Sequence, residues 1–564
     1  MCGIAGELAN NTSLKLFEES LDKINSRGPN ATGIFTKNEY IFGHKRLSIL
    51  DLDDRSNQPM SYKNLTITYN GEIYNYKELK NKYLNEYEFE TNGDTEVLLK
   101  LWHRFGTDSL KYLRGMWSFS IYDSNQDNLY LVRDYFGIKP LFYNDKIFSW
   151  ASDVNFWNSK ELTPNIININ TFILSGKTEY DNSTFFLELK KVPPASILIR
   201  NSNGCISIES YLNFIYSDKN NLKNSITQSI KAHLVSDVNV GAALSGGIDS
   251  SSIVSQSFNS LKMVFTAGST EKNSDQYYAE KLSKEFSLKQ VQINLDNLDL
   301  NEYLNYTVIA QGEPFDGFSV VLQNILYSEV KNNNIKVNLS GQGADELFLG
   351  YKKYLLLYLK KNKYNLKSII TIFKNNSDVK IIDFLSAILI KPWMISVWSK
   401  IFVFRFLKNS NFYDYYKELF SSLNKGIKSI QYFEIFGSNL QSLLRYEDRN
   451  SMFYSIESRV PFVDREIFNN IIDHPKLGEA GRFKNLLINN SGVPKFISER
   501  RSKLGFHANI SKYLETNRKN IKQEVINSSF VKQYVKSNMI SKLINKDKFL
   551  IRLYILKLWG ERFQ

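Results

Sequence analysis

The residues best suited to covalent chemistry stand at the start of the chain, in the segment MCGIAGE. The sequence holds only two cysteines in 564 residues, and one of them, Cys2, directly follows the initiator methionine. Removal of Met1 would give Cys2 a free α-amino group, which titrates near ~8 and can act as a base toward the thiol of the same residue. A cysteine is also often a small buried apolar side chain. This segment alone leaves both interpretations open.

A glycine-rich segment in the second half, LSGGIDSS, has the residue types of a phosphate-binding loop. It stands between the apolar run VNVGAAL, typical of a strand buried in a parallel sheet, and a helical pattern from Ser250 to Phe258. Ligands of such sheets bind at the carboxyl ends of strands, and a helix N-terminus favours negative charge. Close backbone approach and hydroxyl donation to phosphate are expected from Ser245, Gly246, Gly247 and Ser250. Strand, loop and helix together predict a nucleotide site rather than an ordinary glycine turn.

Two aspartates predict a magnesium ion at this site. Asp249 is a carboxylate among phosphates, where it is best explained as a Mg²⁺ ligand, and Asp345 in the second glycine-rich segment, LSGQGADE, is placed to share the ion. Two carboxylates and two glycine loops around one triphosphate favour cleavage at the α-phosphate. Pyrophosphate then stays in the loops, held by backbone N–H groups, basic side chains and magnesium, while adenylate passes to an acceptor.

The elements that must position these residues fall into two domains, as expected for a chain of this length. Residues 1–205 carry short alternating apolar runs, such as LTITYNGEIYNY, MWSFSIYD, NLYLVRD, KIFSWASD and TFILSG, which predict strands of a sheet-rich domain. A short helical pattern, Thr95–Phe105, lies among them. Residues 215–564 begin with alternating strand and helix patterns, which predict a doubly wound parallel sheet, and continue from about Tyr351 as mostly helical.

Composition and charge argue against several classes of protein. Hydrophobic residues make up 43% and charged residues 23%, as in ordinary globular proteins, and two cysteines cannot form a disulfide framework, which fits a reducing cytoplasm. The net charge of +13 comes from scattered lysines without a dense basic run, so we expect no nucleic acid partner.

One apolar segment, Ile381–Phe406, raises the question of a membrane span. Charged residues and a proline interrupt it, so no run reaches the length that a transmembrane span requires. We expect a helical hairpin packed on the body of the protein, with an interface for a partner or a membrane surface as the alternative.

Nine segments, in this order along the chain, resemble one known family. They are MCGIAG, SRGPNATG, GHKRLSILD, YNGEIYNY, TNGDTEVLL, RDYFGIKPLFY, SDVNVGAALSGGIDSS, LSGQGADELFLGY and LLRYEDRNSMFYSIESRVPFVD. Along nearly its whole length the chain resembles the glutamine-hydrolysing asparagine synthetases. The resemblance implies an N-terminal nucleophile (Ntn) αββα sandwich, the class II glutamine amidotransferase domain. An ATP-pyrophosphatase-type synthetase domain then follows, with a doubly wound parallel sheet and a helical C-terminal part.

The implied reaction converts aspartate, glutamine, ATP and water to asparagine, glutamate, AMP and pyrophosphate. Cys2 would attack the side-chain amide of glutamine and form a glutamyl thioester, with its own α-amino group as the base. Asn70 and Gly71 would donate to the tetrahedral oxyanion. Arg46 would pair with the α-carboxylate of glutamine. The implied glutamine-binding set is Arg46, Leu47, Ser48, Ile49, Leu50, Asn70, Gly71, Glu72 and Asp94, in which Glu72 and Asp94 would hold the α-ammonium group.

The resemblance also assigns residues of the second domain. ATP, a substrate, would contact Leu244, Ser245, Gly246, Gly247, Asp249, Ser250, Ala267, Ser340 and Gly341, and Mg²⁺ would bind Asp249 and Asp345. Lys484, in GRFKNLL, matches a family lysine that supports the adenylated intermediate, with a surface lysine on a helix as the alternative interpretation. A homodimer is expected by analogy with the family alone.

The chain departs from the family pattern at the loop SGQG, where the family commonly has SGEG. That glutamate matters for forming the β-aspartyl adenylate, whereas Gln342 keeps its shape and hydrogen bonding without its charge. Ala195 and Leu349 stand where glycines are usual, and Asp153 stands where a glutamate is usual.

Three hypotheses therefore stay open. The first is an asparagine synthetase. The second is a sister amidotransferase that adenylates another carboxylate, such as a sugar acid, which Gln342 and the segment Ile381–Phe406 favour. The third is a binding protein on a retired scaffold, and the residues that argue against it are Cys2, Arg46, Asp249 and Asp345.

Overall fold

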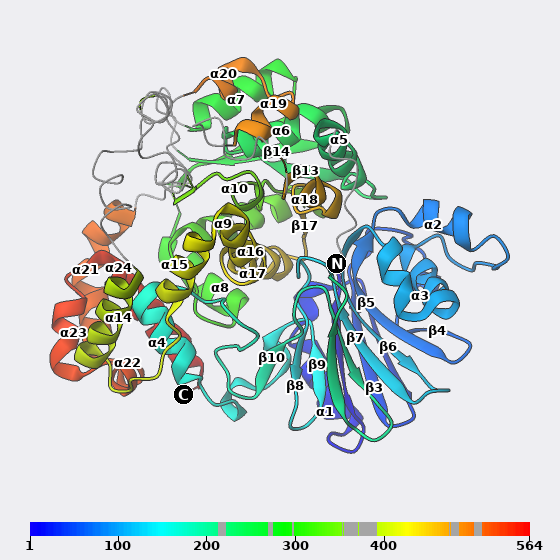
Figure 1. The fold of residues 1–564 in the computed structure, drawn as a ribbon, viewed down its shortest axis with the longest axis horizontal. Helices are drawn as coiled ribbons and strands as arrows, with labels where there is room; N and C mark the ends of the chain where they lie inside the picture. The colour runs from blue at the N-terminus through cyan, green and yellow to red at the C-terminus, as the bar shows by residue number, and fades with distance from the viewer. Residues whose placement is uncertain are drawn as a thin grey trace.

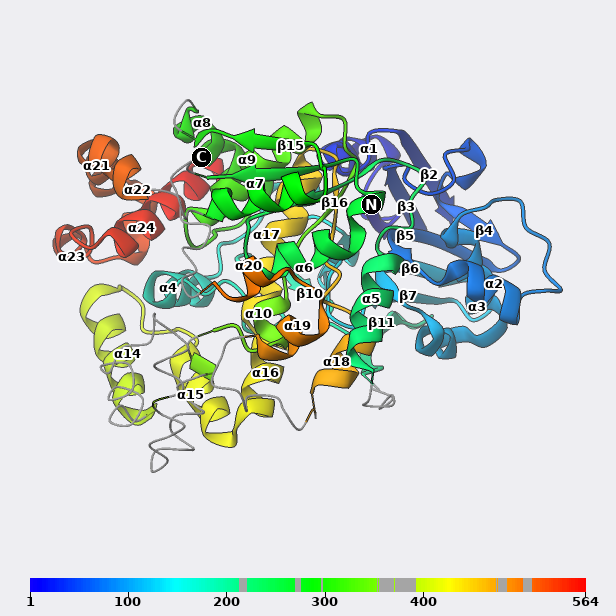
Figure 2. The same cartoon turned by 90° about the horizontal axis from the view of Figure 1, so that it is seen from above.

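The computed structural model describes residues 1–212, 221–268, 275–295, 298–351, 353–354, 370, 392–472, 474, 484–500 and 510–563. The N-terminal domain, blue to cyan in Figure 1, lies beside a larger part that holds a parallel sheet and most of the helices. Figure 1 and Figure 2 both place the start of the chain where these two parts meet. The first residues of the chain can therefore contact both parts.

Two antiparallel sheets of six strands form the N-terminal domain. The first has the order β10 (Leu189–Lys191), β8 (Phe142–Asn144), β9 (Ser149–Ala151), β1 (Gly3–Leu8), β3 (Tyr40–Arg46) and β2 (Ala31–Lys37). The second has the order β12 (Ile206–Ser210), β11 (Ser196–Arg200), β7 (Asn128–Arg133), β6 (Gly115–Asp123), β5 (Leu65–Ile73) and β4 (Met60–Tyr62). The second sheet thus runs to Ser210.

Helices cover the outer faces of the two sheets. Helix α1 (Leu14–Asp22) packs on β3 of the first sheet, while α2 (Tyr76–Tyr83) and α3 (Asp94–Phe105) lie on the side of β5 in the second. The facing sheets enclose a core of apolar side chains from both, including Ile4, Phe42, Tyr122, Leu131 and Trp150. This is the αββα sandwich that the sequence predicts.

Strand β1 is held firmly because it is internal to its sheet. It pairs antiparallel with β3 on one side and β9 on the other. Its glycines allow close packing: a Cβ on Gly6 would lie 2.0 Å from the Trp150 ring. Cys2 directly precedes this strand, so its backbone is fixed rather than frayed.

The larger part contains a five-stranded parallel sheet. Its order is β15 (Gln290–Ile293), β14 (Met263–Ala267), β13 (Val240–Ala243), β16 (Val337–Leu339) and β17 (Glu457–Arg459). All five strands are parallel. Along the chain, β14 and β15 are added on one side of β13, whereas β16 and β17 are added on its other side, so the strand order reverses between β13 and β16. The doubly wound sheet predicted for the second domain is therefore present, and its ligand site is expected at this reversal.

Helices surround this sheet and make up most of the remaining described chain. Those near the sheet are α5 (Leu222–Ala232), α6 (Ile248–Ser257), α7 (Asp275–Glu285), α8 (Leu300–Gln311), α9 (Ser319–Asn332), α10 (Ala344–Leu347), α17 (Asn439–Phe453), α18 (Arg465–Ile471), α19 (Asn485–Asn490) and α20 (Lys495–Ser498). The others are α14 (Pro392–Phe406), α15 (Tyr415–Lys425), α16 (Ile427–Phe436), α21 (Ile510–Asn527), α22 (Ser529–Tyr534), α23 (Ser537–Leu543) and α24 (Asp547–Gly560). Within the described ranges, none of these helices combines the length and apolarity that crossing a membrane requires.

One strand prediction was wrong. The run TFILSG belongs to helix α4 (Ile166–Ser175), which is covered by α14, α22 and α24 and lies among the C-terminal helices in Figure 1. Because most of its residues are buried, its sequence is apolar on nearly every face, and such a run does not distinguish a buried helix from a strand. The predicted hairpin in Ile381–Phe406 is described only from Pro392 onward, as α14; residues 381–391 lie outside the described ranges.

Candidate functional site

A small cavity at the start of β1 collects most of the residues predicted to bind glutamine. Its lining is Met1, Cys2, Arg46, Leu47, Ile49, Leu50, Ser56, Gln58, Tyr69, Gly71, Glu72, Gly93, Asp94 and Thr95. Two predicted residues do not line it: the Ser48 N–H donates to Asn30 Oδ1 at 3.0 Å, and Asn70 is fully buried. Sequence reasoning missed Ser56, Gln58, Tyr69, Gly93 and Thr95. Tyr69, Gly93 and Thr95 are sequence neighbours of predicted residues, and this could have indicated that they belong to the site. Ser56 and Gln58 come from a segment that no motif marks.

Asn70 holds the backbone of the candidate nucleophile. The Cys2 N–H donates to Asn70 Oδ1 at 2.9 Å, and Asn70 Nδ2 donates to Ser118 Oγ at 3.3 Å. The next residue must be glycine, because a Cβ on Gly71 would lie 2.2 Å from the Met116 carbonyl oxygen. Burial raises the pKa of the Cys2 thiol, although the N-terminal ammonium group acts in the opposite direction. A nucleophilic thiol at this position therefore needs a nearby base.

Two buried carboxylates, Glu72 and Asp94, line the cavity and give it negative character. Burial, together with Glu457 and Asp94, raises the pKa of Glu72 well above its usual range. Burial also raises the pKa of Asp94 to about 6, even though Asp94 accepts hydrogen bonds from Tyr69 Oη and the Ile73 N–H, both at 2.8 Å. Glu72 also faces Arg459, at 3.6 Å. Raised pKa values on adjacent carboxylates indicate negative charge that lacks enough cations, which suits the binding of an ammonium group.

The lining of the cavity also carries a cation, Arg46. Arg46 is 5% exposed, and its guanidinium group donates to the carbonyl oxygens of Asp51 and Asp53 and to Asn57 Oδ1. All three acceptors are neutral, so the positive charge is held in place without being cancelled by them. A planar guanidinium group beside a cavity is well suited to a carboxylate.

Met1 is buried and forms part of the lining of this cavity. Its ammonium group donates to Glu457 Oε2 at 2.7 Å. Burial would raise the pKa of Glu457, but this ammonium group, Arg459 and Lys139 outweigh burial and lower that pKa to about 2. With Met1 in place the cavity has a volume of only about 30 Å³. A cavity of this size holds only a few water molecules, far less than the volume of a glutamine molecule.

A second, larger cavity of about 260 Å³ lies at the reversal point of the parallel sheet. The loop after β13 and the loop after β16 meet there: a Cβ on Gly341 would lie 3.0 Å from Asp249 Cβ. The predicted residues in its lining are Leu244, Ser245, Asp249, Ser250, Ser340, Gly341 and Asp345. The others do not line it, namely Gly246, Gly247 and Ala267. Gly246 has a φ of +73° and packs against α7, where a Cβ would lie 2.1 Å from the Asp275 carbonyl oxygen.

Lys484 links the two predicted magnesium ligands. Its ammonium group lies 2.5 Å from Asp249 Oδ2 and 2.6 Å from Asp345 Oδ1. Lys484 is 4% exposed and precedes α19 with a φ of +54°, so it is not a surface lysine on a helix. Burial alone would lower its pKa, but the two carboxylates raise it above its usual range.

The donor set around Lys484 fits magnesium carried by a nucleotide. The described residues hold no group of three or more His, Cys, Asp or Glu side chains arranged for a metal ion. Magnesium at phosphate sites typically takes one or two carboxylates and completes its octahedron with phosphate oxygens and water. Asp249 and Asp345 supply those two carboxylates: both line the cavity, and both also contact the Lys484 ammonium group.

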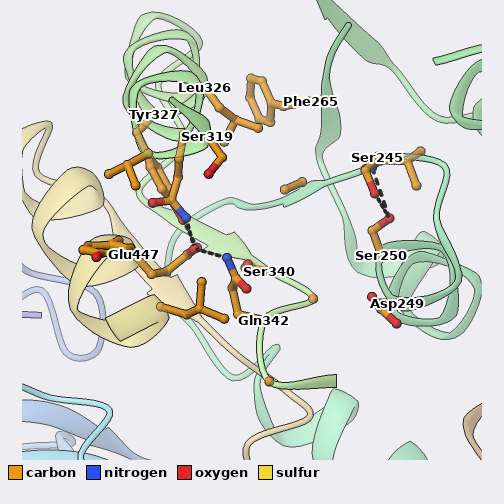
Figure 3. Close-up of a pocket in the computed structure, with 18 of the residues that line it drawn as sticks. Ser245, Asp249, Ser250, Phe265, Ser319, Leu326, Tyr327, Ser340, Gln342 and Glu447 are labelled. Carbon is orange, nitrogen blue, oxygen red and sulfur yellow. Dashed lines mark hydrogen bonds between the residues drawn. The ribbon is translucent and has the colours of Figure 1, made fainter. Parts of the chain in front are cut away.

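The far wall of this cavity includes Gln323 and Tyr327 of α9 and Glu447 of α17, three residues that the sequence did not single out. Gln342 of the loop after β16, which the sequence marked as a departure from the family pattern, also lines it. Figure 3 shows Glu447 and Gln342 pointing toward each other, across the cavity from Asp249 and Ser250. Glu447 lies within one of the segments that resemble the family, LLRYEDRNSMFYSIESRVPFVD, but the sequence does not tell which of its residues face a cavity.

Three consecutive residues of α17 reach three different places. Glu447 lines the second cavity. Asp448 forms a two-pronged ion pair with Arg27, at 2.8 and 3.3 Å, and Arg27 Nε donates to the Cys2 carbonyl oxygen at 3.3 Å. Arg449 pairs with Glu313 at 2.8 Å. One helix of the second domain therefore contacts both candidate sites.

Comparison with known proteins agrees with this two-part arrangement. Residues 1–212 match the family model described as a glutamine amidotransferase domain, and residues 221–561 match the model described as asparagine synthase. The chain is 29% identical to asparagine synthetase [glutamine-hydrolyzing] 1 of Bacillus subtilis, over 96% of this chain and 93% of that protein. It is 33% identical to a putative asparagine synthetase [glutamine-hydrolyzing] of Methanocaldococcus jannaschii, over 63% of this chain and 76% of that one. It is also 27% identical to amidase chry2 of Gibberella zeae, over 60% of this chain and 55% of that protein.

Proposed function

Because the chain belongs to the asparagine synthase family and carries a glutamine amidotransferase domain, we propose that it is a glutamine-dependent asparagine synthetase. The proposed reaction takes aspartate, glutamine, ATP and water to asparagine, glutamate, AMP and pyrophosphate. The observation that carries it is the pairing of two cavities. One is lined by a thiol, two carboxylates and a guanidinium group, and the other has two glycine-rich loops and two carboxylates at a sheet reversal.

In the first half-reaction, glutamine lies with its α-ammonium group toward Glu72 and Asp94 and its α-carboxylate toward Arg46. The Cys2 sulfur attacks the side-chain amide carbon, and the α-amino group freed by loss of Met1 takes the thiol proton. Gly71 N–H donates to the oxyanion, while Asn70 keeps the Cys2 backbone in place. Ammonia leaves, and water then releases glutamate from the thioester.

In the second half-reaction, the acceptor carboxylate attacks the α-phosphorus of ATP and pyrophosphate leaves. Ser245, Ser250, Ser340 and Gly341 line the phosphate end of the cavity, and Asp249 and Asp345 would hold Mg²⁺. The metal would neutralise charge on the phosphates. Lys484, which contacts Asp249 and Asp345, would stabilise the adenylated acyl group. Ammonia then displaces AMP from that group.

The test is to incubate the purified protein with magnesium, ATP, glutamine and aspartate, and to measure AMP and asparagine by mass spectrometry. We expect both products in equal amounts, with formation that depends on aspartate. Replacement of Cys2 by alanine should abolish the use of glutamine and leave ammonia-dependent synthesis intact. Glutamine-dependent synthesis by that variant would contradict the role of Cys2.

The second candidate is a sister amidotransferase with another carboxylate acceptor, such as a sugar acid. It is favoured by Gln342, which stands where the family commonly has a glutamate, and by relatives named as amidases. Glutaminase activity with neither AMP nor asparagine formed from aspartate would support this candidate, and AMP formation with a sugar acid would establish it.

A further inference from the structure

The carboxylate of Glu447 is buried in the wall of the second cavity and receives hydrogen bonds only from neutral groups of the described residues. Glu447 is 4% exposed. Its Oε1 accepts from Tyr327 Oη and from Ser458 Oγ, the latter at 2.6 Å, and its Oε2 accepts from the side-chain amide of Gln323. Such donors hold the carboxylate in place, but they do not cancel its charge. A buried charge is costly unless it is paired, so a cation on a ligand in this cavity would be stabilised.

The same carboxylate fixes the amide of Gln342. Gln342 Nε2 donates to Glu447 Oε2 at 3.4 Å, as Figure 3 shows. The two ends of an amide are often ambiguous in a structure, but a carboxylate can only accept, so the NH₂ group must face Glu447. The carbonyl oxygen of Gln342 therefore faces away from Glu447, on a side chain that lines the cavity. The wall at this point presents an acceptor and a nearby negative charge.

The resemblance to the family implies a glutamate at position 342. In this chain position 342 is glutamine, and the carboxylate beside it is that of Glu447. A glutamate at 342 would bring two carboxylates within hydrogen-bonding distance of each other, where like charges disfavour joint ionisation. Glutamine at 342 instead donates a hydrogen bond to Glu447 of α17. The negative charge of this wall is thus supplied by the helix rather than by the loop.

We propose that Glu447 determines acceptor specificity: it orients Gln342 and, together with it, recognises a protonated amino group on the acid that is adenylated. This inference rests on the proposed function. Recognition of the amino group by Glu447 and Gln342 would select amino acids such as aspartate over acids that offer only hydroxyl groups. A hydroxyl group can donate to the Gln342 oxygen but brings no charge to balance that of Glu447, whereas an ammonium group that donates to this oxygen also brings a positive charge close to Glu447.

The test compares acceptors and variants in the ammonia-dependent reaction, which bypasses Cys2. AMP formation is measured with aspartate, with succinate, which is the same diacid without its amino group, and with glucuronate, which offers hydroxyl groups. We expect the wild-type protein to prefer aspartate over both in kcat/KM. The Glu447→Gln variant should lower the ratio of kcat/KM for aspartate to that for succinate by about tenfold or more, the range expected for a hydrogen bond to a charged group. KM for ATP and glutaminase activity should not change.

Two further variants separate recognition from folding. Glu96→Gln removes a buried carboxylate of the first domain, which pairs with Lys100 at 2.5 Å outside both cavities, and it should leave the acceptor ratio unchanged. The double variant Gln342→Glu with Glu447→Gln keeps one charge and one amide in contact and should regain part of the preference for aspartate. An equal loss for aspartate and succinate in Glu447→Gln, or a wild-type protein indifferent to the amino group, would overturn this inference and leave the proposed ligase activity standing. Absence of AMP with every acid would overturn the proposed function itself.

Discussion

At the scale of single residues, Asp94 connects pH to the binding of glutamine. Burial raises the pKa of this carboxyl from 3.8 to about 6, so it is mostly protonated below that pH and loses its attraction for an ammonium group. We expect the KM for glutamine to rise as the pH falls below about 6, measured as glutamate released by the wild-type protein. Asp94→Asn should have a high KM at every pH. A KM for glutamine that stays constant from pH 5 to pH 8 would contradict the role of Asp94.

The raised pKa of Asp94 also makes the stability of the folded protein depend on pH, and low pH favours stability although it disfavours glutamine binding. In the unfolded chain Asp94 ionises near its ordinary value of 3.8, whereas in the folded protein it ionises only near 6. Its contribution to stability is therefore complete below about pH 4 and is lost as the pH rises through 6.

Lys484 allows a second prediction at this scale. Lys484→Met keeps the length of the side chain but removes the cation between Asp249 and Asp345. We expect AMP formation to fall by about 100-fold or more, since charge stabilisation at a phosphoryl site is worth that much, while glutaminase activity stays intact. Pyrophosphate release measures the first activity. Lys100→Met, which removes a buried and paired lysine outside both cavities, is the matched control and should retain synthesis.

Sequence reasoning works best for residues whose chemistry is local. The loop serines, the two aspartates and Cys2 lie in short motifs, and the structure brings Ser245, Ser250, Asp249 and Asp345 around one cavity. Glu447 and Gln323 are different, because their position in the wall depends on how α17 and α9 pack, over sequence distances that no motif spans. Ser56 and Gln58 were missed because no motif marks the segment that brings them to the first cavity.

At the scale of elements, backbone conformation explains two of the departures from the family pattern. Ala195 has a φ of +49° and Leu349 a φ of +57°, the left-handed region where glycine is at ease. The sequence marked both positions as unusual but did not indicate the cause. A side chain in this region costs about 1–2 kcal/mol.

Ala195→Gly tests that cost. The relief of about 1–2 kcal/mol is offset by the loss of a buried methyl group, about 0.8 kcal/mol, and by the greater freedom of glycine in the unfolded chain, about 0.4–1 kcal/mol. We expect a stability within about 1 kcal/mol of the wild-type protein, measured by urea unfolding. Ala151→Gly, at an equally buried position in β9 of the same domain, gains no such relief and should be about 1–2 kcal/mol less stable. Equal losses in both variants would show that the left-handed conformation carries no strain.

Element types were predicted well where the apolar period was clear. The strands of the sandwich alternate between two faces, and β13 and β14 read as buried parallel strands. The prediction for helix α4 was wrong because α14, α22 and α24 bury this helix on several sides. A helix buried on several sides has apolar residues all around, so its sequence lacks the 3.6-residue apolar period by which a helix is recognised.

At the scale of the whole molecule, the two domains are joined by paired charges. Arg27 binds Asp448 and also donates to the Cys2 carbonyl oxygen, whereas Arg114 binds Asp464, at 2.8 Å, away from Cys2. Arg27→Lys keeps the charge, but a single ammonium group cannot reproduce this planar set of donors. We expect Arg27→Lys to release more glutamate than AMP, because the nucleophile loses its link to the second domain. Arg114→Lys is the control, and its ratio should stay near one to one. Equal ratios in the two variants would contradict a special role for Arg27.

The three consecutive contacts of α17 also limit how this protein can evolve. Successive side chains of a helix point about 100° apart, so Glu447, Asp448 and Arg449 reach outward in different directions from one rigid rod. A mutation that tilted or slid this rod to admit a bulkier acceptor would displace the Arg27 clamp on Cys2 and the Arg449–Glu313 pair in the same movement. Natural selection therefore has little freedom to reshape the acceptor wall by moving its backbone. New acceptors would instead arise by exchange of side chains on a fixed frame, at positions such as 342, where the family resemblance implies glutamate and this chain has glutamine.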